Sequence, residues 1–101
     1  MASFEDHVRA ALDALPPELA RGLENVAVVV EERNPDEPDL YGVFEEPPYL
    51  PARIAIYRRP LVEDFGHDPE RLEREIRITV LHELAHYFGI DEDRLEELGY
   101  A

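Results

Sequence analysis

The sequence contains no cysteine, and this absence excludes several kinds of site. Disulfide bonds, thiolate ligands for metals and cysteine nucleophiles are all ruled out. Because small secreted domains often need disulfides to stay folded, the missing cysteines favour a cytoplasmic location. The first 15 residues include acidic side chains and no continuous apolar run, so they do not resemble a signal peptide. No stretch is long and apolar enough to predict a membrane span.

Lysine is missing as well: all ten basic residues are arginines, against 24 acidic residues. The resulting net charge of −14 repels phosphate backbones, which argues against a nucleic-acid partner. An acidic surface of this kind keeps a protein in solution and can also attract a basic peptide.

The chain has 101 residues, the length of a single domain, and we expect one domain over residues 1–101. Its 45% of hydrophobic residues is within the range of globular proteins, but so short a chain builds only a modest core. A homodimer is compatible with a small core and an open sheet edge.

Capping residues and breakers predict three helices before the end of the chain. Ser3 and Asp6 form a capping box at the start of a helix that ends at Pro16, and a shorter helical turn is expected over residues 18–24. Asp68, followed by a proline, is typical of a helix N-cap and predicts a long helix over residues 69–88. Its buried face is predicted to consist of Leu72, Ile76, Val80, Leu84 and Phe88.

Three segments between the helices have the composition of strands. Residues 26–30 are apolar and mostly β-branched, residues 40–45 are apolar and aromatic around a glycine, and residues 53–57 alternate between polar and apolar. Residues 61–67 are expected to be a connector. This order of elements predicts an α+β fold.

The residues with the clearest chemistry lie inside the predicted long helix, where His82, Glu83 and His86 spell H-E-x-x-H. Residues four apart lie on one face of a helix, so both imidazoles can reach one metal ion. Glu83 lies about 100° around the helix from His82, close enough to hold a water beside that ion without being a ligand. The pattern is the signature of zinc peptidases, with Glu83 as the general base.

A catalytic zinc site needs a third protein ligand, and the residues after the motif offer one. Gly89 predicts the end of the helix one turn after His86, because glycine adopts the left-handed conformation of a C-cap without strain. Asp91 then fits the N-cap of a short new helix, so the chain turns back toward the metal. Glu92 is the predicted third ligand, and Asp93 is the alternative.

At these residues the chain resembles the small, single-domain bacterial zincin-like metallopeptidases known as minimal zincins. Residues 82–92, H-E-L-A-H-Y-F-G-I-D-E, are similar to the H-E-x-x-H-x-x-G-x-x-D signature of that family. The resemblance implies a zincin-like domain with a small mixed sheet of about three strands, packed on the long H-E-x-x-H helix between N-terminal and C-terminal helices. It also implies a zinc ion in each chain. Either segment 40–45 or segment 53–58 would then be an edge strand that pairs with a peptide substrate.

The chain departs from related patterns at two points. Glu92 stands where the signature has aspartate, which moves the ligand oxygen outward. The only methionine is Met1, so the Met-turn that supports the site in metzincins is absent. Tyr100 is the residue we expect to support the site instead.

Two hypotheses for the function follow from these residues. The first is a zinc metallopeptidase that acts on a peptide or protein substrate. The second is a zincin-like scaffold with weak or no catalysis that binds a peptide or protein partner. Metal-dependent endoribonucleases with an H-x-x-x-H-x-x-G-x-x-H pattern fit poorly, because the third histidine is missing and the charge opposes RNA.

Overall fold

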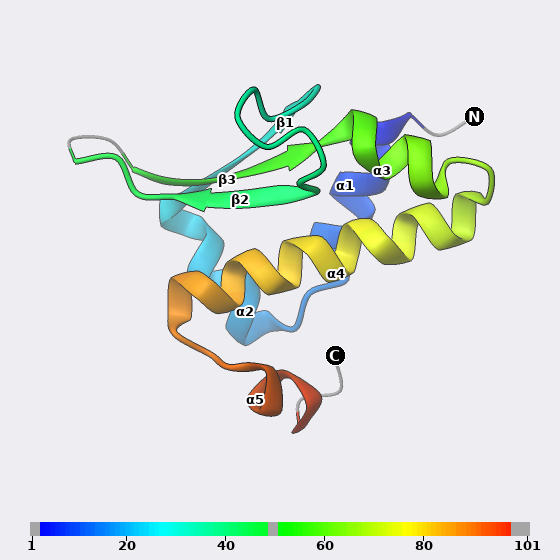
Figure 1. Cartoon of the computed structure of the whole chain (residues 1–101). Helices are drawn as coiled ribbons and strands as arrows, with labels where there is room; N and C mark the ends of the chain where they lie inside the picture. The colour runs from blue at the N-terminus through cyan, green and yellow to red at the C-terminus, as the bar shows by residue number, and fades with distance from the viewer. Residues whose placement is uncertain (1–2, 49–50, 98–101) are drawn as a thin grey trace.

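The fold is built on a three-stranded mixed sheet with the order β1-β3-β2 (Figure 1). The computed structural model describes residues 3–48 and 51–97, without the side chains of Glu18, Glu92 and Leu95. Strand β3 (Ala52–Tyr57) is central, β1 (Val26–Glu31) pairs with it in parallel, and β2 (Gly42–Glu45) pairs with it antiparallel. The α+β class, the three strands and the mixed sheet are thereby confirmed.

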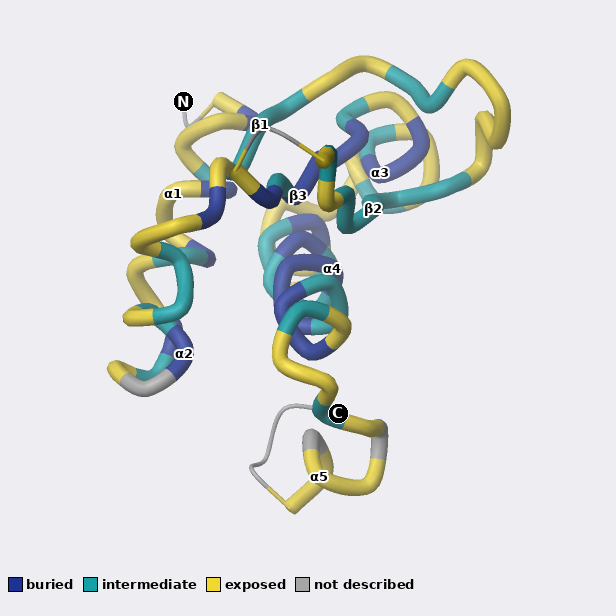
Figure 2. The backbone as a smooth tube through the Cα atoms, turned by 90° about the vertical axis from the view of Figure 1, so that its left-hand side faces the viewer, coloured by how far each residue is buried: buried dark blue, intermediate teal, exposed yellow. Residues whose placement is uncertain are grey.

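The long helix α4 (Pro69–Phe88) runs below this sheet, and α1 (Phe4–Asp13) lies beside it (Figure 2). The remaining helical elements are α2 (Pro17–Gly22), the 3-10 turn η1 (Leu23–Asn25), α3 (Arg58–Phe65) and α5 (Glu92–Glu97). Ser3 and Asp6 form the predicted capping box of α1. One hydrophobic core joins α1, α4 and the lower face of the sheet, with Ile54 and Ile56 of β3 fully buried.

Helix α4 begins and ends where the sequence predicts. The Asp68 side chain accepts hydrogen bonds from the backbone N–H groups of Glu70 and Arg71, and a proline occupies the first helical position. Gly89 has φ 68° and ψ 27°, the left-handed conformation that a β-carbon opposes. The Ile90 N–H donates to the Ala85 carbonyl at 2.8 Å, which completes a Schellman cap.

Two predictions about the fold are wrong, one about packing and one about secondary structure. Phe88 is not part of the buried face of α4: it is 41% exposed, whereas the other four predicted residues are buried. Its ring lies against the Cα of Gly22 at the end of α2, where a β-carbon would be only 1.9 Å from the ring. Residues 61–67 are not a connector, because α3 covers Arg58–Phe65. Pro60 is compatible with this helix because the first turn needs no intrahelical N–H donor there.

Strand β2 is an edge of the sheet, as predicted for one of the two candidate segments, while β3 is central. The strand also contacts α4 at two places. A β-carbon on Gly42 would lie 2.8 Å from the Cγ2 atom of Thr79, so the strand backbone rests directly on the helix. The rings of Phe44 and Tyr87 pack edge to face, with centroids 5.5 Å apart. These contacts fix an open strand edge beside the helix that carries the histidines.

Candidate metal and catalytic site

The H-E-x-x-H residues occupy the last two turns of α4, near its capped end. The His86 side chain is 68% exposed, whereas the Glu83 side chain is only 12% exposed. Glu83 Oε2 lies 3.5 Å from His86 Nδ1, and His82 is half-buried. The helix therefore supplies an accessible imidazole with a sheltered carboxylate next to it.

The contacts of α4 show why Glu83 is sheltered. Residues four before and four after it are Thr79 and Tyr87, which share its side of the helix. Thr79 underlies Gly42 and Tyr87 packs on Phe44, so both neighbours of Glu83 contact β2. Glu83 is consequently directed toward the edge strand, where a bound peptide would present its backbone.

The pairing of the sheet shows which backbone groups of β2 face outward. The Tyr57 N–H donates to the Tyr41 carbonyl at 2.8 Å, which makes these two residues a hydrogen-bonded antiparallel pair. Pairs alternate along an antiparallel ladder, so the N–H and C=O groups of Gly42 and Phe44 point away from β3. Among the described residues no strand pairs with this side of β2. The edge therefore offers two residues for main-chain pairing with an extended peptide.

Negative charge gathers at the start of this edge. The Tyr41 hydroxyl donates to Asp64, a hydrogen bond that favours the neutral phenol. This bond, burial and the nearby charges of Asp64, Glu75 and Asp39 raise the pKa of Tyr41 to about 12. A peptide lying along β2 would meet an acidic environment here.

The third-ligand prediction is not tested by the structure. Among the side chains that the structure describes, which do not include Glu92, no group of three or more histidine, aspartate or glutamate residues is arranged to hold a metal ion. The Glu92 side chain and the whole of Tyr100 lie outside what the structure describes. Asp93 is exposed on α5, and its role as the alternative ligand stays a prediction. Asp91 does cap α5, since its Oδ1 accepts the Arg94 N–H at 2.9 Å.

Sequence reasoning misses the residues that hold the edge strand against the helix. Helical spacing places Thr79 on the same face as the histidines but does not show what covers it. In the structure Thr79 is buried beneath Gly42, and its hydroxyl donates to the Glu75 carbonyl. The signal that could have found this contact is the glycine inside a strand pattern, because such a glycine often marks a close approach of another backbone or side chain.

Comparison with known proteins decides the family. A family model described as zincin-like metallopeptidase matches residues 23–100 of the chain. The chain belongs to this family. A solved structure of a conserved hypothetical protein from Thermus thermophilus is similar, with 26% sequence identity and a TM-score of 0.60. The similarity covers 85% of this chain and 91% of that one. None of the curated proteins matches significantly.

Two of the described residues are suited to be metal ligands of a zincin-like metallopeptidase. His82 and His86 stand one helical turn apart, and imidazole nitrogen is a preferred ligand of zinc. The sheltered Glu83 beside them suits a group that handles protons without binding the metal. In the described part of the chain no helix is long and apolar enough to cross a membrane.

Proposed function

We propose that this protein is a zinc-dependent metallopeptidase that hydrolyses peptide bonds of an extended substrate. The observation that carries the proposal is that Glu83 is only 12% exposed and lies 3.5 Å from His86 Nδ1, on the side of α4 whose neighbouring residues contact β2. His82 and His86 would hold the metal, with Glu92 as the third ligand and Asp93 as its alternative. A bound zinc ion would polarise the substrate carbonyl and make water a better nucleophile. The absence of cysteine supports a cytoplasmic location.

The residues of this chain have separate tasks in that reaction. Gly42 and Phe44 bind the substrate backbone along β2 and hold its carbonyl above α4. Glu83 accepts a proton from the attacking water as its oxygen bonds to the carbonyl carbon. The same carboxyl group then gives the proton to the leaving nitrogen as the C–N bond breaks, which yields a carboxylic acid and an amine.

A second function is favoured by a specific observation. The open edge of β2 needs no metal in order to pair with a peptide. A zincin-like scaffold that binds a peptide or protein partner without cleaving it is therefore the alternative. Glu83 argues for catalysis, because a metal with a purely structural role needs no base beside it.

The Glu83→Gln variant separates these functions in a cleavage assay with a peptide library and zinc-loaded protein. Glutamine keeps the size of the side chain but cannot accept the proton, so we expect hydrolysis to fall by roughly two to four orders of magnitude with zinc content unchanged. Glu70→Gln, an exposed change at the other end of α4, is the matched control and should keep full activity. Equal cleavage by wild type and Glu83→Gln would contradict the mechanism, and peptide binding without cleavage by either would support the scaffold.

A further inference from the structure

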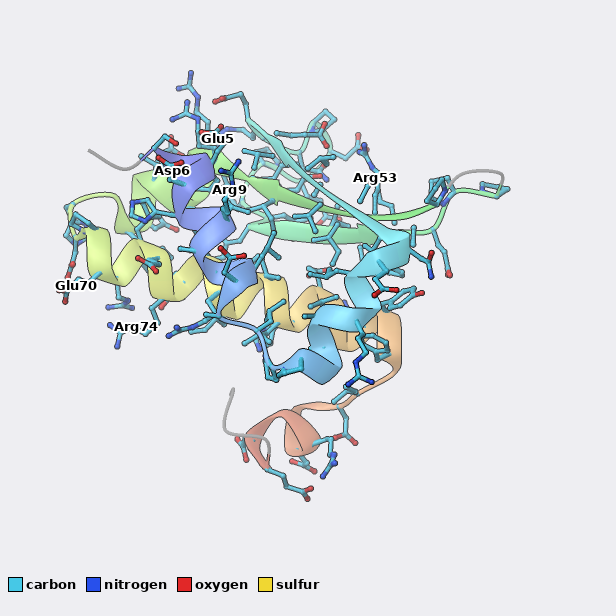
Figure 3. The ribbon with its side chains drawn as sticks, turned by 180° about the vertical axis from the view of Figure 1, so that it is seen from behind. Glu5, Asp6, Arg9, Arg53, Glu70 and Arg74 are labelled. Carbon is cyan, nitrogen blue, oxygen red and sulfur yellow. The ribbon has the colours of Figure 1, made fainter. Side chains whose placement is uncertain are left out.

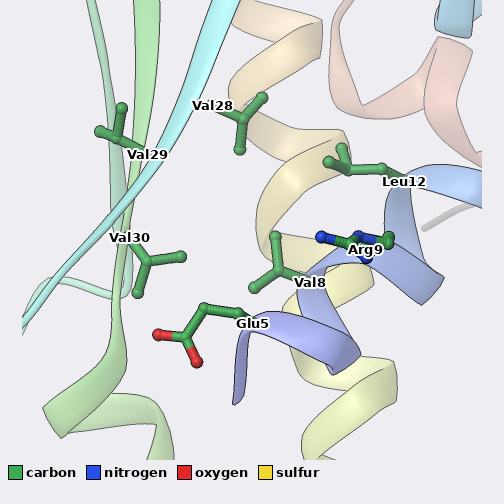
Figure 4. Close-up of a pocket in the computed structure, with 7 residues that line it drawn as sticks. All are labelled: Glu5, Val8, Arg9, Leu12, Val28, Val29 and Val30. Carbon is green, nitrogen blue, oxygen red and sulfur yellow. The ribbon is translucent and has the colours of Figure 1, made fainter. Parts of the chain in front are cut away.

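An open groove lies between α1 and β1, at the opposite edge of the sheet from the candidate site (Figure 4). Its volume is about 510 Å³. Five apolar residues line it together with Glu5 and Arg9: Val8 and Leu12 of α1, and Val28, Val29 and Val30 of β1. Figure 4 shows Val28 and Val30 directed toward α1. The partly exposed valines of β1 in this groove are open to contact by a partner.

Strand β1 is the second edge of the sheet, and its outward backbone groups can be assigned. Because the Tyr57 N–H points to β2, Ile54 and Ile56 of β3 direct their backbone groups to β1. The register partners of Ile54 and Ile56 are Val28 and Val30. In a parallel pair, the backbone groups of Ile54 and Ile56 bond the residues before and after these partners, and not the partners themselves. The N–H and C=O groups of Val28 and Val30 therefore point outward, beside the groove.

Arginine side chains offset part of the negative charge around this edge. Arg53 of β3 pairs with Glu31 at 3.0 Å and with Glu45 of β2 at 2.6 Å. Glu32 pairs with Arg58 at 2.7 Å and with Arg59 at 3.1 Å. Glu5 and Arg9 lie one turn apart along α1 (Figure 3), and Arg9 forms no ion pair with the residues that the structure describes. The arginines weaken the electrostatic attraction of this edge for a basic peptide. They also reduce its repulsion of an acidic partner, such as a second copy of this chain.

Glu5 and Arg9 make the groove complementary to itself. Figure 4 shows Glu5 beside Val30 and Arg9 with Leu12 nearer to Val28, so α1 and β1 run in opposite directions. If two β1 strands pair antiparallel about Val29, Val28 of one copy lies opposite Val30 of the other. The same two-fold axis then brings Glu5 of each copy to the level of Arg9 of the other.

We propose that the groove between α1 and β1 is the contact face of a two-fold homodimer, in which a second copy of this chain covers Val8, Leu12, Val28 and Val30. The two sheets join through β1, so the edge is no longer exposed to aggregation. The β2 edges and both H-E-x-x-H helices stay open at the far sides of the joined sheet. The dimer is independent of metal binding and of hydrolysis.

The charge arrangement gives a direct test by sedimentation equilibrium of the full chain over a range of concentrations. Wild type should reach twice the 11.7 kDa mass of the chain. Arg9→Glu places two glutamates opposite each other at both ends of the contact, so the dissociation constant should rise roughly tenfold or more. The double variant Glu5→Arg/Arg9→Glu restores opposite charges across the axis and should recover wild-type dimerisation. Arg94→Glu on α5 is the control and should leave the dimer unchanged.

Far-UV circular dichroism of each variant shows whether a loss of dimer is a loss of fold. The proposal is overturned if wild type stays monomeric at several hundred micromolar, or if Arg9→Glu leaves the dimer intact. It is also overturned if the folded double variant fails to dimerise. Shifts of the Val28 and Val30 amide signals of a monomeric wild type on adding an arginine-rich peptide would identify a basic partner in place of a second copy.

Discussion

Tyr41, just before the edge strand β2, lies among several carboxylate groups. Its hydroxyl donates to Asp64, and the field of three carboxylates opposes ionisation of the phenol. The group stands immediately before Gly42, the first residue of β2. Any change in its charge is therefore felt at the end of the proposed substrate edge.

Tyr41 makes the stability of the protein depend on alkaline pH. Its folded-state pKa is raised to about 12, above the ordinary value of 10.0, so the fold favours the neutral phenol. The stabilisation is complete below pH 10 and is lost as the pH rises toward about 12. We expect Tyr41→Phe to lower the free energy of unfolding near pH 8 and to reduce its decline between pH 10 and 12, measured by urea denaturation.

Absorbance at 295 nm follows tyrosine ionisation and provides the control for this prediction. The difference between the titrations of wild type and Tyr41→Phe should report a phenol that ionises near pH 12. A difference curve with its midpoint at pH 10 would contradict the role given to Asp64, Glu75 and Asp39.

Among the elements, the contact between β2 and α4 positions the candidate site. Gly42 has no room for a side chain, because a β-carbon would lie 2.8 Å from Thr79 Cγ2 and 3.0 Å from the Ala55 carbonyl oxygen. Phe44 and Tyr87 hold the other end of the strand. The spacing between Glu83 and the outward backbone of β2 is set by these two contacts.

Gly42→Ala should push β2 away from α4 and destabilise the protein by about 1–3 kcal/mol, the usual cost of overpacking a well-packed contact. Thr79→Ser removes Cγ2, so in the double variant part of this loss should be recovered. Because the Ala55 carbonyl is also close, we do not expect full recovery. Urea denaturation of the two single variants and the double variant measures the coupling, and strictly additive effects would show that Gly42 and Thr79 do not touch.

The sequence predicts elements whose signals are local and misses features that depend on distant contacts. Helix α4 is predictable because Asp68, Pro69 and Gly89 specify its ends within a few residues. Helix α3 is missed because Pro60 suggests a break, although proline is harmless in a first turn. Phe88 lies on Gly22 of α2 and not in the core, a placement that depends on a distant contact and that no local pattern encodes.

The same distinction applies to the candidate site. The i, i+4 spacing places His82 and His86 on one helix face without any knowledge of the tertiary structure. The shelter of Glu83 arises because β2 crosses α4 at Thr79 and Tyr87, a long-range arrangement. The third ligand depends on how α5 is directed after Gly89, and the Glu92 prediction accordingly stays a prediction.

The whole molecule has a net charge of −14, and the charged side chains near the two edges of its sheet differ. At the β1 edge, Arg58 and Arg59 pair with Glu32, and Arg53 of the central strand pairs with both Glu31 and Glu45. At the start of the β2 edge, Tyr41 lies among three carboxylates. The two edges therefore suit different partners: a second copy at β1, and a peptide substrate at β2.

The most direct test of the central claim is the zinc content of the purified protein, measured by elemental analysis after dialysis without chelator. The proposed peptidase site predicts one zinc ion per chain in wild type and in Glu83→Gln. In His86→Ala it predicts loss of the zinc, because the two remaining ligands cannot hold it in place. Absence of zinc from wild type, even after zinc is added, would contradict the proposed metal site and the hydrolysis that depends on it.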